Sequence, residues 1–187
     1  MKITLKGKTP VAPLPVLIVA TYNDDGSTDA MNVAWGGQSG ASNVTLHLSK
    51  NHRTTANLLK REAFTLSLAT VDTLVMSDFF GITSGAKTDK ITKAGVSVSR
   101  ADEVDAPVID AYPLTMECRV MQITDFEGEA RVDAEIVRTH VDDSMLDEEG
   151  NIDFGKMRLI SFDSQMNLYR EVGAAVGKAF HDGRKLM

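Results

Sequence analysis

The sequence DAMNVAWGGQSGASNVTLHLSKNHRTT, residues 29–55, holds two apolar runs separated by small residues. The first run, Met31 to Trp35, ends in a pair of glycines, and the second, Val44 to Leu48, follows a segment of small polar residues. Short apolar runs bounded by glycine and polar clusters are typical of strands. We therefore predict two strands joined by a loop that lacks bulky side chains.

The second run opens onto a group of hydrogen-bond donors that we regard as a candidate phosphate site. This group contains Ser49, Lys50, Arg53 and Thr54. A phosphate favours positive charge together with several short donors, and a helix starting here would add backbone N–H groups. Glycines in the preceding loop allow a flat ligand to approach the backbone. These features indicate a mononucleotide-like cofactor, and the alternative is a plain hairpin with a solvated helix start.

Composition restricts the class of protein. The chain has 187 residues, enough for one domain with a proper core, and a formal net charge of −6, which argues against a non-specific nucleic-acid binder. Its single cysteine, Cys118, excludes an internal disulfide framework. The apolar run near the N-terminus is far shorter than the roughly 20 residues of a membrane helix. We expect a cytoplasmic protein with neither nucleic acid nor membrane as a partner.

Strands predominate along the rest of the chain, with a few short helices. We expect strands at 16–22 and 64–69, and helices from a cap at Thr54 or Thr55 to Ala63, from a cap at Asp72 to Phe80, and from Lys87 to Ala94. From Leu114 the residues alternate, and the pattern predicts two half-buried antiparallel strands joined by a turn at 126–128. In the first of these strands Cys118 lies on the apolar face, and Glu117 lies on the opposite face. Residues 142–153 are acidic and turn-like, and a last strand or strand-like link is expected at 159–162.

Several motifs point to other chemistries and fail on inspection. Residues 81–88 approach a phosphate-binding P-loop, but Ala86 stands where that loop requires glycine. Residues 142–153 lack the first aspartate of a calcium loop, since Met145 occupies its position. The four histidines show no close ligand spacing, and no serine lies in a Gly-x-Ser-x-Gly setting. We therefore expect neither a metal site nor hydrolase chemistry.

The chain resembles the flavin reductase-like, FMN-binding split-barrel family, especially its flavoredoxin-like branch. The resemblance starts from a hydrophobic strand ending in Tyr22, followed by Asn32-x-x-Trp35-Gly-Gly, and extends over roughly Pro15 to Phe180. The further matching stretches are Ser77–Gly81, Ser84-Gly85 with Asp89-Lys90, Asp105–Pro107 with Tyr112–Leu114 and Glu117-Cys118, and Gly177–Phe180. After Gly37 the sequence departs from relatives that carry a cysteine or a proline-rich loop there.

The resemblance implies a mainly β fold: an antiparallel split β-barrel with short helical insertions, as one domain over residues 1–187, with an N-terminal arm at 1–14 and a C-terminal tail at 173–187. It implies bound FMN, with the flavin ring lined by Asn32, Val33, Ala34 and Trp35, largely through backbone groups. It also brings a second polar cluster towards the cofactor edge, although a solvated helix face is an equal alternative for its lysines. That cluster consists of Ser84, Lys87 and Lys90 together with Asp89.

Because a barrel of this size fills its interior with side chains, the cofactor is expected on its outside, near the interface of a homodimer. The implied activity is that of an oxidoreductase in which bound FMN receives a hydride from NAD(P)H and passes electrons to an acceptor, with no catalytic side chain required. The first alternative is a flavoredoxin-type FMN carrier reduced by a protein partner, which an acidic surface would help to meet. The second is a binding protein without enzymatic activity.

Overall fold

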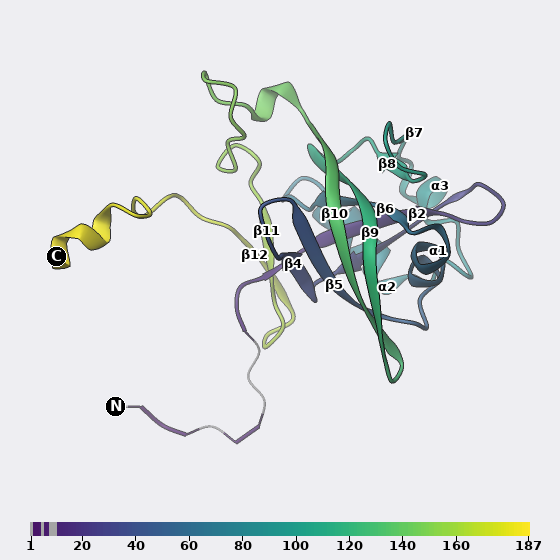
Figure 1. Cartoon of the computed structure of the whole chain (residues 1–187), viewed down its shortest axis with the longest axis horizontal. Coiled ribbons are helices and arrows are strands. Elements are labelled where there is room, and N and C mark those ends of the chain that lie inside the picture. Colours follow the sequence, from purple (N-terminus) through teal and green to yellow (C-terminus); the bar gives the residue numbers. More distant parts are fainter. Residues whose placement is uncertain (1, 5, 8–10) are drawn as a thin grey trace.

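The computed structural model describes residues 2–4, 6–7 and 11–187. Its centre is a seven-stranded antiparallel sheet in the order β3-β2-β6-β9-β10-β5-β4, which curls into a half-barrel (Figure 1). The strands of this sheet are β2 (Leu17–Tyr22), β3 (Thr28–Val33), β4 (Gly36–Gln38), β5 (Asn43–Ser49), β6 (Ala63–Leu68), β9 (Leu114–Phe126) and β10 (Glu129–Val141).

Two smaller sheets complete the fold. One contains β1 (Leu14–Pro15), β11 (Ile160–Asp163) and β12 (Leu168–Glu171), and the other pairs β7 (Val98–Arg100) with β8 (Pro107–Ile109). The expected strands at 16–22, 44–48 and 64–69 are present, and the strand expected at 159–162 is β11. The strand expected from Met31 to Trp35 differs from the structure. There β3 ends at Val33, and a separate strand, β4, starts at Gly36 and pairs with β5. The short strand β12 and the strand pair β7–β8 were not foreseen.

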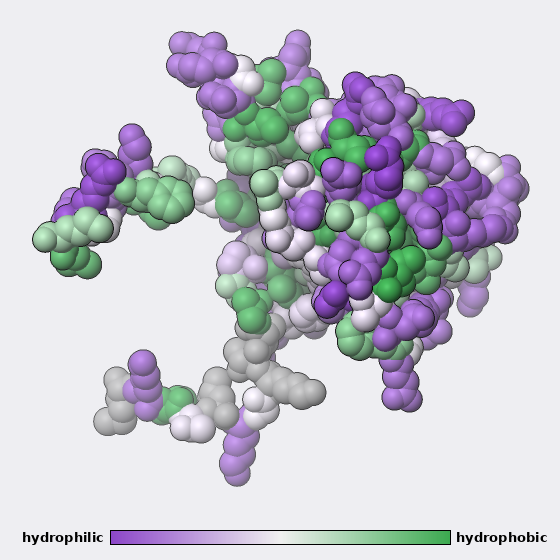
Figure 2. Space-filling model, in the orientation of Figure 1, coloured by the Kyte–Doolittle hydropathy of each residue, from purple (hydrophilic) through white to green (hydrophobic). Residues whose placement is uncertain are grey.

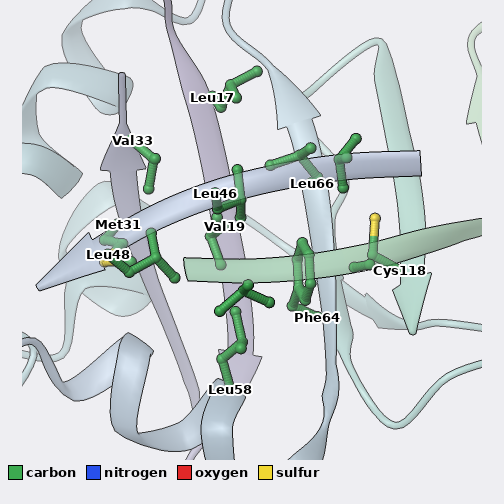
Figure 3. Close-up of a cluster of buried hydrophobic side chains, with 13 residues drawn as sticks. Leu17, Val19, Met31, Val33, Leu46, Leu48, Leu58, Phe64, Leu66 and Cys118 are labelled. Atoms are coloured by element: carbon green, nitrogen blue, oxygen red, sulfur yellow. The ribbon is translucent and has the colours of Figure 1, made fainter. Parts of the chain in front are cut away.

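The concave side of the sheet holds the main core. Side chains from β2, β3, β5 and β6 meet there with Leu58 of α1 and Cys118 of β9 (Figure 3). Successive side chains of a strand point to opposite faces of the sheet, so every second residue points inward. Leu46 of β5 and Phe64 of β6 are fully buried in this cluster. The predicted place of Cys118 on an apolar face is therefore confirmed, and burial raises the pKa of its thiol to about 12.

Three short helices lie on the sheet: α1 (Arg53–Arg61), α2 (Leu74–Ile82) and α3 (Lys90–Ala94). Their starts differ from the sequence predictions. The α1 helix begins at Arg53 with His52 in the N-cap position, so Thr54 and Thr55 lie inside the helix. The α2 helix has Thr73 at its N-cap and continues through Gly81, while α3 starts after Asp89, whose side chain accepts a hydrogen bond from the Thr92 N–H.

The predicted orientation of Glu117 in β9 is confirmed, since Glu117 and Cys118 lie on opposite faces. The half-buried strand predicted there is not, because Glu117, on the face opposite the core, is fully buried. Its carboxylate accepts hydrogen bonds from the backbone N–H groups of Asp102 at 3.0 Å and Glu103 at 2.7 Å, and lies 2.5 Å from His140 Nε2. A loop around residues 101–106 covers this face of the sheet, which local alternation cannot reveal.

The two ends of the described chain leave the body of the molecule. Residues 172–187, including the 3-10 turn Asp182–Leu186, are all exposed, and the tail runs away from the sheet (Figure 1). Another short 3-10 turn, Asp143–Met145, follows β10 at the start of the acidic segment. Part of the predicted arm at 1–14 falls outside the described residues. Among those that the structure describes, no helix is both long and apolar enough to cross a membrane.

Candidate functional site

A cleft of about 920 Å³ lies beside the loop that joins β3 to β4. Its walls come from β3, β5, the C-terminal end of α2 and the β11–β12 hairpin. The lining residues include the consecutive Met31–Gly36 segment, His47–Ser49, His52, Asp78, Gly81, Ile82, Phe162, Asn167 and Tyr169. Four predicted ring contacts, Asn32, Val33, Ala34 and Trp35, thus share one cleft with Ser49 of the predicted phosphate group.

Asn32 is held in one orientation inside this cleft. Its Nδ2 donates to the Ser77 carbonyl at 3.1 Å and to the Tyr169 hydroxyl at 3.5 Å, and that hydroxyl donates to Asp78 Oδ1 at 2.9 Å. Burial and the neighbouring Asp78 raise the pKa of Tyr169 to about 12, so its proton is present at neutral pH. Because both amide hydrogens of Asn32 are engaged, its Oδ1 remains an acceptor.

Gly81 allows this arrangement by letting α2 approach Asn32. A Cβ added at Gly81 would lie 3.1 Å from the Cβ of Asn32, tighter than ordinary van der Waals contact. This close approach favours a residue without a side chain at position 81.

Large apolar side chains at the cleft are unusually exposed. Trp35 is 58% exposed and Ile82 is 77% exposed, although both line the cleft. Exposed apolar groups around a concave site favour a flat, partly apolar ligand or a second protein surface.

The residues of the predicted phosphate site are only partly brought together at the cleft. Ser49 and His52 line it, next to the N-terminus of α1. Arg53 is exposed and its Nη1 donates to the Gly85 carbonyl at 2.8 Å. Lys50 instead pairs with Asp125 at 2.7 Å.

Two further predicted residues belong to a buried polar cluster around Asp29. Thr54 Oγ1 donates to Asp29 Oδ2 at 2.6 Å, and Lys90 Nζ lies 3.2 Å from Asp29 Oδ1 and also donates to the Ala30 carbonyl. All three side chains are almost fully buried. Thr54 and Lys90 are therefore placed in this cluster and not among the residues that line the cleft, because a buried carboxylate requires partners of its own.

The loop between α2 and α3 carries the remaining predicted residues, Ser84 and Lys87. Both are exposed, and neither is among the described residues that line the cleft. The same loop presses against the buried cluster, since a Cβ added at Gly85 would lie 2.1 Å from Asp29 Oδ1. Gly85 thus connects the buried cluster to Arg53 at the surface.

Sequence reasoning missed the cleft residues that arrive from far along the chain. Asp78 and Gly81 lie in a stretch that carried the family resemblance, but they received no role. Tyr169 comes from β12, and 137 residues separate it from Asn32. No local pattern could join them, because the contact depends on how β11 docks through β1 and Thr70.

Comparisons with known proteins agree with this geometry. The family model described as "Flavin reductase like domain" matches residues 11–166. The flavoredoxin of Desulfovibrio vulgaris (Miyazaki F) is 29% identical with a TM-score of 0.93, over 98% of this chain and 100% of that one. The flavoredoxin from Methanosarcina acetivorans is 25% identical with a TM-score of 0.90, over all of both chains.

More distant structures share the fold alone. An FMN-binding protein from Thermus thermophilus, solved with bound 1-cyclohex-2-enone, is 16% identical with a TM-score of 0.77, over 95% of this chain and 99% of that one. A search of the curated proteins finds no match. The predicted antiparallel split barrel and the family resemblance are confirmed: the chain belongs to the flavin reductase-like family.

Proposed function

We propose that this protein is an FMN-binding flavoprotein oxidoreductase that passes electrons from NAD(P)H through bound FMN to an acceptor. The observation that carries the proposal is the cleft that joins Asn32–Trp35 to Ser49 beside the N-terminus of α1. FMN-binding proteins among the structural neighbours support the choice of cofactor.

The residues at the cleft fit such a cofactor. Its volume of about 920 Å³ lies at the upper end of the range for small-molecule sites, roughly 300–1,000 Å³. Apolar walls suit the flavin ring, and the free Oδ1 of Asn32 suits an N–H group on its polar edge. The hydroxyl of Ser49 and the imidazole of His52 line the cleft and suit the phosphate, and the guanidinium of Arg53 starts from the first position of α1 beside them.

Each of these side chains has a distinct task in the proposal. Asn32 accepts a hydrogen bond and thereby orients the ring, while Trp35 and Ile82 exclude water from it. Ser49 and Arg53 hold the phosphate with the N–H groups of α1. Bound FMN supplies the redox chemistry, and the protein supplies binding, orientation and electrostatics. Contacts to the cofactor from Lys50, Thr54, Ser84, Lys87 and Lys90 stay predictions.

An FMN carrier reduced by a protein partner is the second candidate. It is favoured by the similarity to two flavoredoxins and by the net charge of −6, which suits a basic redox partner. For either function we propose a homodimer with the cofactor near its interface, since Trp35 and Ile82 are too exposed to enclose a ring alone. We also propose one domain over residues 1–187 and a cytoplasmic location, which the single buried thiol supports.

The deciding experiment is an absorption spectrum followed by anaerobic titration. The purified protein, or the protein mixed with FMN, should show a flavin spectrum, and Trp35, the only tryptophan, should lose fluorescence as FMN binds. Bleaching of the bound flavin by NADH or NADPH supports the reductase. Bleaching by a reduced protein donor alone favours the carrier. A protein that neither carries nor takes up FMN contradicts both.

A further inference from the structure

The half-barrel has a second opening, which shares no lining residue with the cofactor cleft but adjoins it along β4, where Gly36 lines the cleft and Gly37 lines the second opening. A groove of about 600 Å³ extends from the apolar interior of the sheet to the surface. Its apolar walls are Leu17, Leu66, Leu68, Leu114, Met116 and Ile136. Leu17 and Leu66 belong to the main core itself. The groove is therefore an uncovered end of the hydrophobic core and not a separate depression.

An acidic segment borders this mouth. Residues 142–153 contain six Asp or Glu and neither Lys nor Arg. Ile152 lines the groove at the end of this segment, and Phe154, which follows it, lines the groove and is 53% exposed. Figure 2 shows apolar side chains gathered below the projecting hydrophilic loop at the upper left of the molecule. Arg138 also lines the groove, but it is paired with Asp102 and Glu103. An occupant of the groove should therefore combine apolar side chains with positive charge that faces the acidic segment.

The C-terminal tail has this chemistry. Residues 173–187 carry three cations, Lys178, Arg184 and Lys185, against the single anion Asp182, and the other 172 residues carry a net charge of −8. Val176 and Phe180 are essentially fully exposed. The tail alternates hydrophobic and hydrophilic groups and projects on the same side of the molecule as the acidic loop (Figures 1 and 2).

We propose that the mouth of each half-barrel is closed by the C-terminal tail of a second copy of this chain. Phe180 and Val176 cover the apolar groove, and the tail cations lie against the acidic segment 142–153. Fifteen residues reach up to about 50 Å when extended, enough to cross to a neighbouring subunit. Two copies related by a two-fold axis exchange tails reciprocally. The inference rests on the homodimer of the proposed function and names a second contact between its subunits.

A disulfide between two different chains tests the contact directly. Cys118 is buried, so one chain with Phe154→Cys and a longer, tagged chain with Phe180→Cys each present one accessible thiol. Mixing them under mild oxidation should yield a cross-linked heterodimer in high yield, whereas Lys60→Cys in place of Phe154→Cys should not. A chain carrying both Phe154→Cys and Phe180→Cys that closes on itself as a monomer would overturn the exchange between copies, and so would absence of the heterodimer.

Charge reversal provides an independent test in solution. Reversing the charge of the tail with Lys178→Glu, Arg184→Glu and Lys185→Glu should weaken dimerisation by at least about tenfold in sedimentation experiments. The loop variant Glu148→Lys with Glu149→Lys should do the same, and mixing the two variants should restore association. The control Glu62→Lys with Glu127→Lys changes charge equally at other exposed sites. A tail-deleted chain ending at Val172 that dimerises as tightly as the full chain contradicts the proposal.

Flavin binding separates this inference from the proposed function. A full chain that cross-links through its tail but takes up no FMN would refute the function and leave the tail contact intact. A chain that binds FMN but yields neither the cross-link nor the charge effect would refute the tail contact and leave the function intact. Thermal unfolding followed by circular dichroism checks that each variant is folded.

Discussion

At the scale of single residues, the proposed phosphate site depends most on Arg53. Unlike Lys50 and Lys90, this exposed cation has a backbone carbonyl as its partner, and no carboxylate of the described residues lies within ion-pair distance of it. We expect Arg53→Ala to weaken FMN binding by about tenfold to a hundredfold, the effect of losing one charge-assisted hydrogen bond. Fluorescence titration measures this change.

Lys60→Ala is the matched control for Arg53→Ala, because Lys60 lies on the same helix and is paired with Asp24 at the surface. Its affinity for FMN should equal that of the unchanged protein. Equal affinity for FMN in both variants would remove Arg53 from the site.

Glu117 predicts a pH dependence of stability. Burial alone would raise the pKa of this carboxyl, but hydrogen bonds from His140 and from the N–H groups of Asp102 and Glu103 outweigh burial and lower it below its ordinary value of 4.5. The unfolded state therefore binds the proton more readily. The stabilisation is complete above about pH 4.5 and is lost as the pH falls through the lower pKa of the folded state.

Glu117→Gln should therefore cost about 2–3 kcal/mol at pH 7, since the change leaves buried donors without a charged acceptor. The difference from the unchanged protein should shrink as the pH falls below 4. Denaturant unfolding at several pH values measures it, with the exposed Glu135→Gln as control. A constant difference across this range would mean that the charge of Glu117 contributes nothing.

At the scale of elements, the buried Asp29 cluster joins β3, α1 and the α2–α3 loop. Thr54 of α1 donates a hydrogen bond to Asp29, and Lys90 of α3 forms an ion pair with it. Gly85 packs against Asp29 from the loop. Gly85→Ala would place a Cβ 2.1 Å from Asp29 Oδ1, so the loop must move and release Arg53 from the Gly85 carbonyl.

We expect Gly85→Ala to lower stability by about 1–3 kcal/mol, the usual cost of overpacking, and to weaken FMN binding together with it. Gly37→Ala is the control, since an added Cβ there meets no atom of the described part of the chain within 4 Å. Thermal unfolding and FMN titration of both variants test the link. A variant Gly85→Ala with lower stability but unchanged FMN affinity would separate the loop from the site.

At the scale of the whole molecule, the net charge of −6 distinguishes the two electron donors. The negative charge would attract a basic protein donor, and salt would weaken this attraction by screening it. It would not attract a small anionic nicotinamide. If the protein is a carrier, its rate of reduction should fall several-fold between about 20 and 200 mM salt. Stopped-flow reduction measures this, and a rate with NADH that does not fall as the salt concentration rises supports the reductase.

Sequence alone determined the class of fold and one wall of the candidate site. Alternating and apolar runs at 16–22, 44–48 and 114–136 indicate strands because side chains in a strand alternate with period two. The Asn32–Trp35 segment and Ser49 share a cleft because a short connection keeps β3 and β4 close and β4 pairs directly with β5.

Only the tertiary structure decided the rest. It turned Lys90 and Thr54 inward to Asp29, buried Glu117 under the 101–106 loop, and brought Tyr169 to Asn32 across 137 residues. The physical reason is common to all three. A polar side chain acquires its partner from whichever distant element packs against it, and local periodicity carries information about the face of a strand or helix but none about what covers that face.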